Sequence, residues 1–305
     1  MKRGSTMQIQ VLVNWLDNYL RYQDYPDFII NILQEVDLYS SERYNRDYLR
    51  KATGLMLRCG DKVEAVYCAV FPSDDLIVQL TKYNACNALL IIKHPMDWEE
   101  LGVGFVPMSS QLLDEVKCRS ISVYCAHAAH DNFRDCSPSK EMARNLPLTV
   151  NKAIQDENGR IFGYLAENTR PLSFTEFRTI LTSAFRLPKI QERFAHNQVR
   201  RVAVVSGGGD NGNWLRIIEG MGCDTYLTGI LYFRGSDYAQ QYNPVFIKEL
   251  MDSKLNAFGI SHYFSERNGS IALAQSLSEQ LGLEGKFLPE EKKEEEIRVN
   301  WGYQL

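Results

Sequence analysis

The chain has 305 residues, of which 45% are hydrophobic and 24% charged, an ordinary globular composition with enough apolar material for one large core or two smaller ones. Its 34 basic and 38 acidic residues give a formal net charge of -4, which disfavours a protein that grips nucleic acid through bulk positive charge. The apolar runs, such as residues 88–92, are far shorter than the roughly 20 residues that cross a bilayer. We therefore expect a cytoplasmic protein with a small-molecule substrate and with neither nucleic acid nor membrane as a partner.

Cysteine usage agrees with a reducing compartment. The seven cysteines are an odd number and form no C-x-x-C pair, so they predict free thiols rather than disulfides or a zinc site. Cys68, Cys86 and Cys125 lie in or beside apolar runs, and we expect the thiols to be buried.

Patterns of two kinds alternate in the first half of the chain. Apolar residues at three- and four-residue intervals predict helices, and the region up to residue 59 is expected to be mostly helical. Continuously apolar, β-branched runs predict buried strands, which belong to a parallel sheet covered on both faces. The expected helices are 9–22, 76–83 and 109–117, and the expected strands are 63–71, 88–92 and 120–125.

The same alternation continues after a helix that opens at residues 137–139, where we place a lobe boundary. Ser173 and Glu176 have the spacing of a capping box and predict a helix from residue 174. The other expected helices are 214–220, one from 244, and 270–281, and the expected strands are 161–166, 201–205, 224–227 and 257–260. The acidic and basic tail after residue 289 is typical of a solvated helix end or a disordered segment.

Three of the five histidines, His94, His127 and His262, directly follow predicted strands. The carboxyl ends of parallel strands share one edge of a sheet, where ligands bind, so these side chains are expected at such an edge. Asp131 and Glu266 each follow a histidine by four residues, a spacing that puts both side chains on one helical face.

Imidazole and carboxylate together are the ligands expected at Zn, Fe or Mn sites. A histidine at the end of a strand is also often a hydrogen-bonded core residue, and this alternative is preferred for His130 and His196. Lys93, beside His94, could contact an anionic substrate or project into solvent.

A glycine-rich loop at residues 206–212 contains G-x-G-x-x-G between a predicted strand and a predicted helix. Such a loop could bind a phosphate or a nicotinamide dinucleotide at the helix N-terminus. The acidic residue expected about 20 positions later is missing, because Asp224 begins its strand, so a tight turn is the alternative.

Five segments together resemble the NGG-interacting-factor-three-like family, which is also called GTP cyclohydrolase type two-like: LLIIKHP (89–95), YCAHAAHD (124–131), RVAVVSGGG (201–209), CDTYLTG (223–229) and SHYFSE (261–266). The resemblance runs from about residue 63 to residue 288. It implies two α/β lobes facing each other with a two-metal site between them, the second lobe inserted in the first, and a toroidal homohexamer. With the lobe boundary above, this gives a first lobe of residues 7–136 and 245–305 and a second, inserted lobe of residues 137–244.

The resemblance also implies the ligands. The paired histidines of the family fall on Lys93 and His94, its H-T-x-x-D falls on residues 127–131, and its G-H-x-x-x-E falls on residues 261–266. His94, Asp131, His262 and Glu266 are thereby expected to hold the metal, while His127 would orient Asp131 or carry a proton.

This sequence departs from the family at several positions. Lys93 replaces one histidine ligand, and Ala52-Thr53, Ile230 and Phe233 replace further motif residues. A lysine ammonium removes a ligand and adds repulsion. We therefore expect one firmly held ion, with Lys93 partly replacing the charge of a second.

The function expected on this basis is that of a metal-dependent hydrolase-like protein, in which a divalent metal (Zn, Fe or Mn, one or two ions per chain) activates water against a nucleotide-like or other small substrate. His127 and Lys93 are the candidate catalytic residues. The alternative is a metal-binding or regulatory scaffold without turnover. A third interpretation, a nicotinamide-dependent oxidoreductase, rests on the glycine-rich loop alone.

Overall fold

The computed structural model describes residues 6–25, 27, 29, 44–98 and 100–302, and these form two compact units. The described residues within Met1–Trp98, Phe105–Asp135 and Ser270–Lys292 form unit 1. Those within Glu99–Gly104, Cys136–Gly269 and Lys293–Leu305 form unit 2. The chain thus enters unit 2 close to the expected lobe boundary, but it returns to unit 1 at Ser270, whereas the sequence predicts the return at residue 245. The division into a first lobe of residues 7–136 and 245–305 and an inserted lobe of residues 137–244 stays a prediction.

Unit 1 contains a five-stranded sheet in the order β15-β4-β5-β8-β2. The strands are β2 (Gly54–Leu57), β4 (Ala65–Ala69), β5 (Ala88–Ile92), β8 (Ser122–Cys125) and β15 (Glu284–Phe287). The pairs β15–β4, β4–β5 and β5–β8 are parallel, and β2 runs antiparallel to β8. Every residue of β4, β5 and β8 is buried, which is why their sequences are apolar without alternation.

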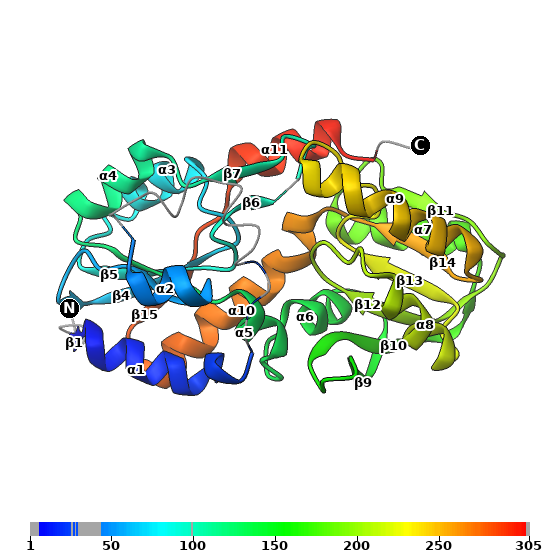
Figure 1. Ribbon diagram of the computed structural model, residues 1–305, viewed down its shortest axis with the longest axis horizontal. Coiled ribbons are helices and arrows are strands. Elements are labelled where there is room, and N and C mark those ends of the chain that lie inside the picture. The colour runs from blue at the N-terminus through cyan, green and yellow to red at the C-terminus, as the bar shows by residue number, and fades with distance from the viewer. Residues whose placement is uncertain (1–5, 26, 28, 30–43, 99, 303–305) are drawn as a thin grey trace. The chain divides into compact units, whose positions relative to one another are not determined.

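Helices cover both faces of this sheet. In Figure 1, α3 (Asp75–Lys82) and α4 (Ser110–Cys118) lie on one face, and α1 (Ile9–Tyr19) lies on the other. The remaining elements of unit 1 are short: η1 (Tyr22–Asp24), α2 (Arg46–Lys51), α5 (His127–Asn132), and the pairs β1 (Met7–Gln8) with β3 (Lys62–Val63) and β6 (Met96–Trp98) with β7 (Phe105–Pro107). The region before residue 59 is therefore not only helical, because β2 joins the sheet there, and residues 30–43 lie outside the described residues.

Unit 2 contains a six-stranded mixed sheet in the order β11-β14-β13-β12-β10-β9. The strands are β9 (Thr149–Gln155), β10 (Ile161–Leu172), β11 (Gln191–Arg193), β12 (Val199–Val205), β13 (Thr225–Thr228) and β14 (Asn256–Gly259). β12, β13 and β14 are parallel, while β11, β10 and β9 pair antiparallel with β14, β12 and β10, respectively. The edge strand β9 carries mostly exposed and half-buried residues, so it lacks the apolar pattern that predicts a strand.

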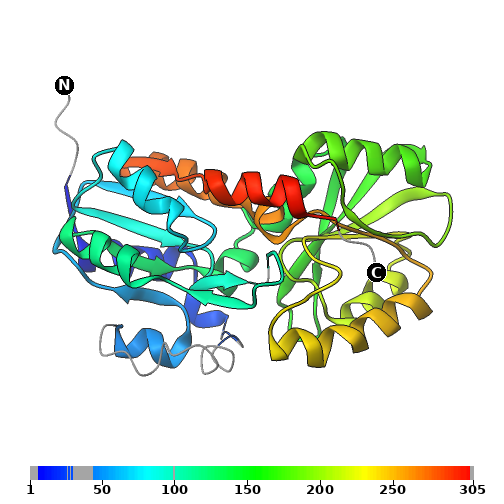
Figure 2. The same cartoon turned by 90° about the horizontal axis from the view of Figure 1, so that it is seen from above.

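The two faces of this sheet pack on different helices. Ala257 joins the core cluster that includes Leu215 of α8 (Gly212–Gly220) and Phe246 of α9 (Asp237–Asp252). The next residue, Phe258, points to the opposite face and stacks on Phe174 of α7 (Phe174–Phe185). Figure 2 shows α7 and α9 on opposite sides of the sheet. The capping box predicted for Ser173 and Glu176 is present at the start of α7 and is confirmed.

Three helices complete the fold: α6 (Pro138–Arg144), α10 (His262–Leu281) and α11 (Glu291–Asn300). α10 begins eight residues before the predicted start at residue 270, because residues 262–266 are buried on every side and show no amphipathic period. The tail after residue 289 forms α11. No helix in the described part of the chain is long and apolar enough to span a membrane.

All seven cysteines are free, as predicted. The expectation that they are buried is wrong for Cys86 and Cys118, which are exposed, and Cys59 is half-buried. Cys86 lies between α3 and β5, and Cys118 ends α4, so neither belongs to the apolar face of its neighbouring element.

Candidate metal centre

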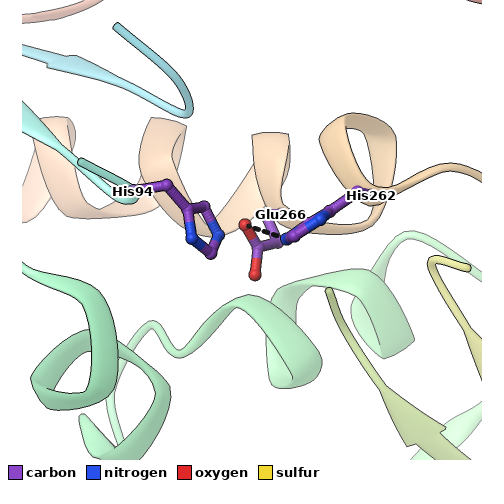
Figure 3. Close-up of side chains that lie close together, drawn as sticks. All are labelled: His94, His262 and Glu266. Carbon is purple, nitrogen blue, oxygen red and sulfur yellow. Dashed lines mark ion pairs between the residues drawn. The ribbon is translucent and has the colours of Figure 1, made fainter. Parts of the chain in front are cut away.

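His262 and Glu266 lie one turn apart on α10 and are each at most 2% exposed. His262 Nε2 lies 3.4 Å from Glu266 Oε2, and Figure 3 shows the two side chains facing each other. This geometry confirms that the spacing of four residues places the two groups on one face of a helix. Two side chains of types that can bind a metal are therefore held together by the first turns of one helix, in unit 2.

The position of His262 is fixed by the way α10 begins. Ser261 has a φ of 100°, and its Oγ accepts a hydrogen bond of 3.1 Å from the Phe264 N–H. The buried Glu100 carboxylate accepts a 2.6 Å hydrogen bond from the Tyr263 N–H. A carboxylate is stabilised at a helix N-terminus, where backbone N–H groups lack partners within the helix. These contacts hold His262 as the first residue of α10, directly beyond β14.

The glycine-rich loop after β12 lies against this pair. Gly207 has a φ of 78°, and a Cβ atom there would lie 2.8 Å from Glu266 Oε1 and 3.3 Å from His262 Nε2. The Gly207 N–H donates a 2.9 Å hydrogen bond to Ser265 Oγ, between the two residues of the pair. Only glycine combines this backbone conformation with this close approach.

Asp210 is a candidate functional residue that the sequence analysis did not single out. Burial raises its pKa to about 6, although nearby His262 acts in the opposite direction. Its Oδ2 is buried and has no hydrogen-bond partner among the described residues. A carboxyl group with such a pKa can gain or lose a proton near neutral pH. The available sequence signal was an acidic residue in a loop that directly follows a buried strand.

The other glycines of the loop are explained by packing rather than by phosphate binding. A Cβ atom at Gly209 would overlap Thr228, and one at Gly212 would overlap the carboxylate of Glu249. The start of α8 therefore already faces a carboxylate, which would repel a pyrophosphate. This arrangement argues against the nicotinamide-dependent oxidoreductase and favours the tight turn.

In unit 1, His94 directly follows β5 and is 2% exposed. Its ring lies among aromatic side chains, with centroid distances of 4.8 Å to His127, 5.3 Å to Phe71 and 5.7 Å to Trp98. The His94 N–H donates to the Val70 carbonyl beyond the end of β4. The imidazole is thus oriented by packing at the carboxyl edge of the unit 1 sheet, as the strand pattern predicted.

Lys93 is also buried, at 2% exposed, so it does not project into solvent. Its Nζ lies 3.0 Å from Asp131 Oδ2, and the Asp131 side chain is 32% exposed. The structure therefore gives Asp131 an ammonium partner. A role for Asp131 as a metal ligand stays a prediction.

His127 begins α5 and pairs with a different carboxylate. His127 Nδ1 lies 2.5 Å from Asp27 Oδ2, and the Asp27 side chain is fully buried. Burial raises the pKa of Asp27, but the charge and hydrogen bond of His127 outweigh it and the pKa is lowered overall. The hydrogen bond seen at Nδ1 fixes the imidazole orientation through Asp27, whereas the sequence analysis expected Asp131 in that contact.

Two other observations bear on the candidate residues. His196 Nδ1 lies 3.5 Å from Asn256 Nδ2, and His130 is buried on α5, in keeping with the packing role expected for both. Burial raises the pKa of Cys125, at the end of β8, to about 12, so this thiol is protonated at neutral pH and is a poor nucleophile.

His94 in unit 1 and the His262–Glu266 pair in unit 2 are buried residues of the types that supply metal ligands. Their two imidazole nitrogens and one carboxylate oxygen are donors suited to Zn, Fe or Mn. The donor set is therefore chemically suitable for a divalent first-row ion.

Comparison with known proteins identifies the family. Residues 33–294 match the family described as Duf34/NIF3 (NGG1p interacting factor 3). The chain is 23% identical over 280 residues to a GTP cyclohydrolase 1 type 2 homolog of Pyrococcus horikoshii, over 91% of this chain and 96% of that one. It is 24% identical over 284 residues to a protein of the same name from Archaeoglobus fulgidus, over 92% of this chain and 98% of that one.

A solved structure shows the same fold. The protein ybgI, whose title gives its function as unknown, matches with a TM-score of 0.66 and 19% identity, over 92% of this chain and 97% of that chain. The mixed α/β fold and the resemblance drawn from the sequence are both confirmed. The chain belongs to the Duf34/NIF3 family.

Proposed function

We propose that this protein is a metal-dependent hydrolase-like member of its family, acting on a nucleotide-like or other small substrate. The observation that carries the proposal is the buried His262–Glu266 pair on α10, against which the Gly207 backbone packs. A buried imidazole and carboxylate are stable when they pair with each other, as here, and the same two groups can also bind one metal ion. A metal ligand role accounts for both residues.

His94 supplies the third ligand in this proposal, and Asp131 is a fourth candidate. His94 lies at the carboxyl edge of its own sheet with its ring held by aromatic neighbours. When bound, a divalent ion lowers the pKa of a coordinated water to about 7, which supplies a nucleophile at neutral pH.

Lys93 and His127 have the remaining roles in this proposal. Lys93 holds Asp131 and would neutralise an anionic substrate or leaving group. His127, oriented by Asp27, would carry a proton through its other ring nitrogen. These two are the proposed catalytic residues.

A regulatory or metal-binding scaffold without turnover is the second candidate. It is favoured by Lys93, whose buried ammonium stands where the family resemblance implies a histidine ligand and already pairs with Asp131. In this case the ion would serve assembly. In either case we propose a cytoplasmic homohexamer, on the resemblance alone.

The two candidates differ in how they respond to Glu266→Gln. The parent, loaded with Zn or Mn, is assayed for hydrolysis of nucleoside phosphates and carboxylic esters. The amide of Gln is a poor metal ligand, so the hydrolase proposal predicts that Glu266→Gln lowers the rate of hydrolysis by roughly 100-fold or more. Replacing a residue that only hydrogen-bonds to a ligand typically costs about 10- to 100-fold. Glu279→Gln is the matched control, since Glu279 is exposed on the same helix and loses the same charge.

Activity that survives both treatment with a metal chelator and Glu266→Gln would contradict the hydrolase proposal. A folded, metal-loaded parent that is inert on every substrate would favour the scaffold. Circular dichroism of each variant separates loss of the site from loss of the fold.

A further inference from the structure

A polar cavity lies in unit 2, on the side of α10 away from the His262–Glu266 pair. It has a volume of about 320 Å³, near the lower end of the 300–1,000 Å³ typical of small-molecule sites. Residues from the ends of α6 and α7, the first turns of α10, and α11 line it: Asn145, Ala184, Phe185, Arg186, Phe264, Arg267, Asn268, Glu294 and Arg298. On α10, Phe264 and Asn268 point away from the pair because they are about half a turn from His262 and Glu266.

Positive charge predominates in this cavity. Three arginines, Arg186, Arg267 and Arg298, line it together with a single carboxylate, that of Glu294. Glu294 Oε1 lies 3.0 Å from Arg267 Nε, and Glu294 Oε2 lies 3.1 Å from Arg298 Nη2. One acidic group thus orients two guanidinium groups and leaves an excess of two positive charges.

The same carboxylate makes the cluster rigid. The buried Tyr263 hydroxyl donates a 2.9 Å hydrogen bond to Glu294 Oε1. The Arg298 guanidinium lies 4.9 Å from the centre of the Phe264 ring, a cation–π distance. The Arg267 and Arg298 side chains are each 35% exposed, so they are partly desolvated and held rather than extended into water.

Other lining groups have donors to spare. The side chains of Arg186, Asn145 and Asn268 make no hydrogen bond or ion pair with any residue in the described part of the chain. A guanidinium carries five N–H donors and a carboxamide two. Arg186 ends α7, where a cation is stabilised by the helix macrodipole, but that stabilisation alone requires neither the other two arginines nor a cavity.

We propose that this cavity binds a small phosphorylated molecule, at a site separate from the metal centre. Three arginines from three different elements line it, and a tetrahedral phosphoryl group has three terminal oxygens that can accept hydrogen bonds from different directions. A planar carboxylate offers two oxygens and suits one bidentate arginine. The two excess positive charges match a phosphate dianion.

Isothermal titration calorimetry with pyrophosphate tests the site on full-length protein pretreated with a chelator, so that a metal ion cannot hold the anion. We expect one site per chain in the parent and at least a tenfold weaker affinity in Arg186→Gln and in Arg298→Gln. The Arg186 side chain makes no hydrogen bond or ion pair within the described residues, so its replacement should change the melting temperature little. Arg200→Gln, which removes an exposed arginine on β12, is the charge-matched control and should bind as the parent does.

Two further arms decide between explanations. Pyrophosphate binding that persists in Glu266→Gln would show that the cavity is independent of the proposed metal centre. Binding that is lost in Glu266→Gln but retained in Arg186→Gln would assign the anion to the metal centre and overturn the proposal. Citrate binding as tightly as pyrophosphate would overturn the phosphoryl assignment. No heat of binding in the parent would refute the site. Equal weakening in Arg200→Gln would show a general charge effect and would also refute it.

Discussion

Lys93 is the residue at which this chain departs most informatively from its family resemblance. A lysine in a ligand position could have been displaced to the surface, but the side chain is buried and its Nζ lies 3.0 Å from Asp131. A buried ammonium is tolerated only when paired, because the cost of removing its charge from water is large. The pairing supports the hypothesis that Lys93 replaces part of the charge that a second ion would supply.

Lys93→His tests this hypothesis directly. It removes the ammonium that pairs with Asp131 and adds an imidazole, so the metal content measured by elemental analysis should rise from about one to about two ions per chain. Lys189→His, an exposed lysine changed in the same way, is the control and should leave the content unchanged. An unchanged content in Lys93→His would mean that Lys93 does not exclude a second ion.

Gly207 is the residue of the glycine-rich loop that packs against the His262–Glu266 pair. Gly207→Ala forces a side chain into a φ of 78° and places a methyl group 2.8 Å from Glu266 Oε1. Gly159→Ala is a matched control, since Gly159 has a φ of 76° but no atom within 4 Å of the added Cβ. Both variants should lose about 1 kcal/mol or more of unfolding free energy in urea titrations, from the backbone conformation.

Metal content should separate these two glycines. We expect Gly207→Ala to bind clearly less metal than the parent, because its methyl group displaces the Glu266 carboxylate, and Gly159→Ala to bind as much as the parent. Equal metal content in the two variants would show that the loop does not support the ligands.

At the scale of an element, the capping box of α7 offers a test of the fold alone. Ser173 Oγ accepts a hydrogen bond from the Glu176 N–H. The Ser173 N–H in turn donates a 2.7 Å hydrogen bond to Glu176 Oε2. Ser173→Ala should lower the unfolding free energy by about 1 kcal/mol without changing metal content. Ser183→Ala, exposed on the same helix, should have little effect, and an equal loss in both would refute the capping contribution.

Over the whole molecule, the elements that could be predicted are those with strong local patterns. β5 was predicted with its observed bounds, Ala88–Ile92, because every residue is buried and apolar. The edge strand β9 and the first turns of α10 were missed, since one carries mixed exposure and the other is buried all round. Periodicity reports only a contrast between faces, so elements without that contrast give no signal.

The candidate site shows the same limit in its side-chain contacts. The spacing of His262 and Glu266 predicted their common face because the geometry of a helix is local. The pairing of His127 with Asp27, across 100 residues, could not be predicted, because nothing in the local sequence marks Asp27. Contacts between residues far apart in the sequence depend on how the whole chain folds.

The central claim is that His262 and Glu266 hold a metal ion, and metal content measures it most directly. We would determine metal per chain by elemental analysis after supplying Zn or Mn, comparing the untagged parent with a His262→Ala, Glu266→Ala double variant. A His196→Ala, Glu279→Ala double variant removes the same residue types elsewhere and serves as the control. We predict about one ion per chain in the parent and in the control and none in the His262, Glu266 variant. A folded parent that binds no metal, or a His262, Glu266 variant that binds as much as the parent, would contradict the claim.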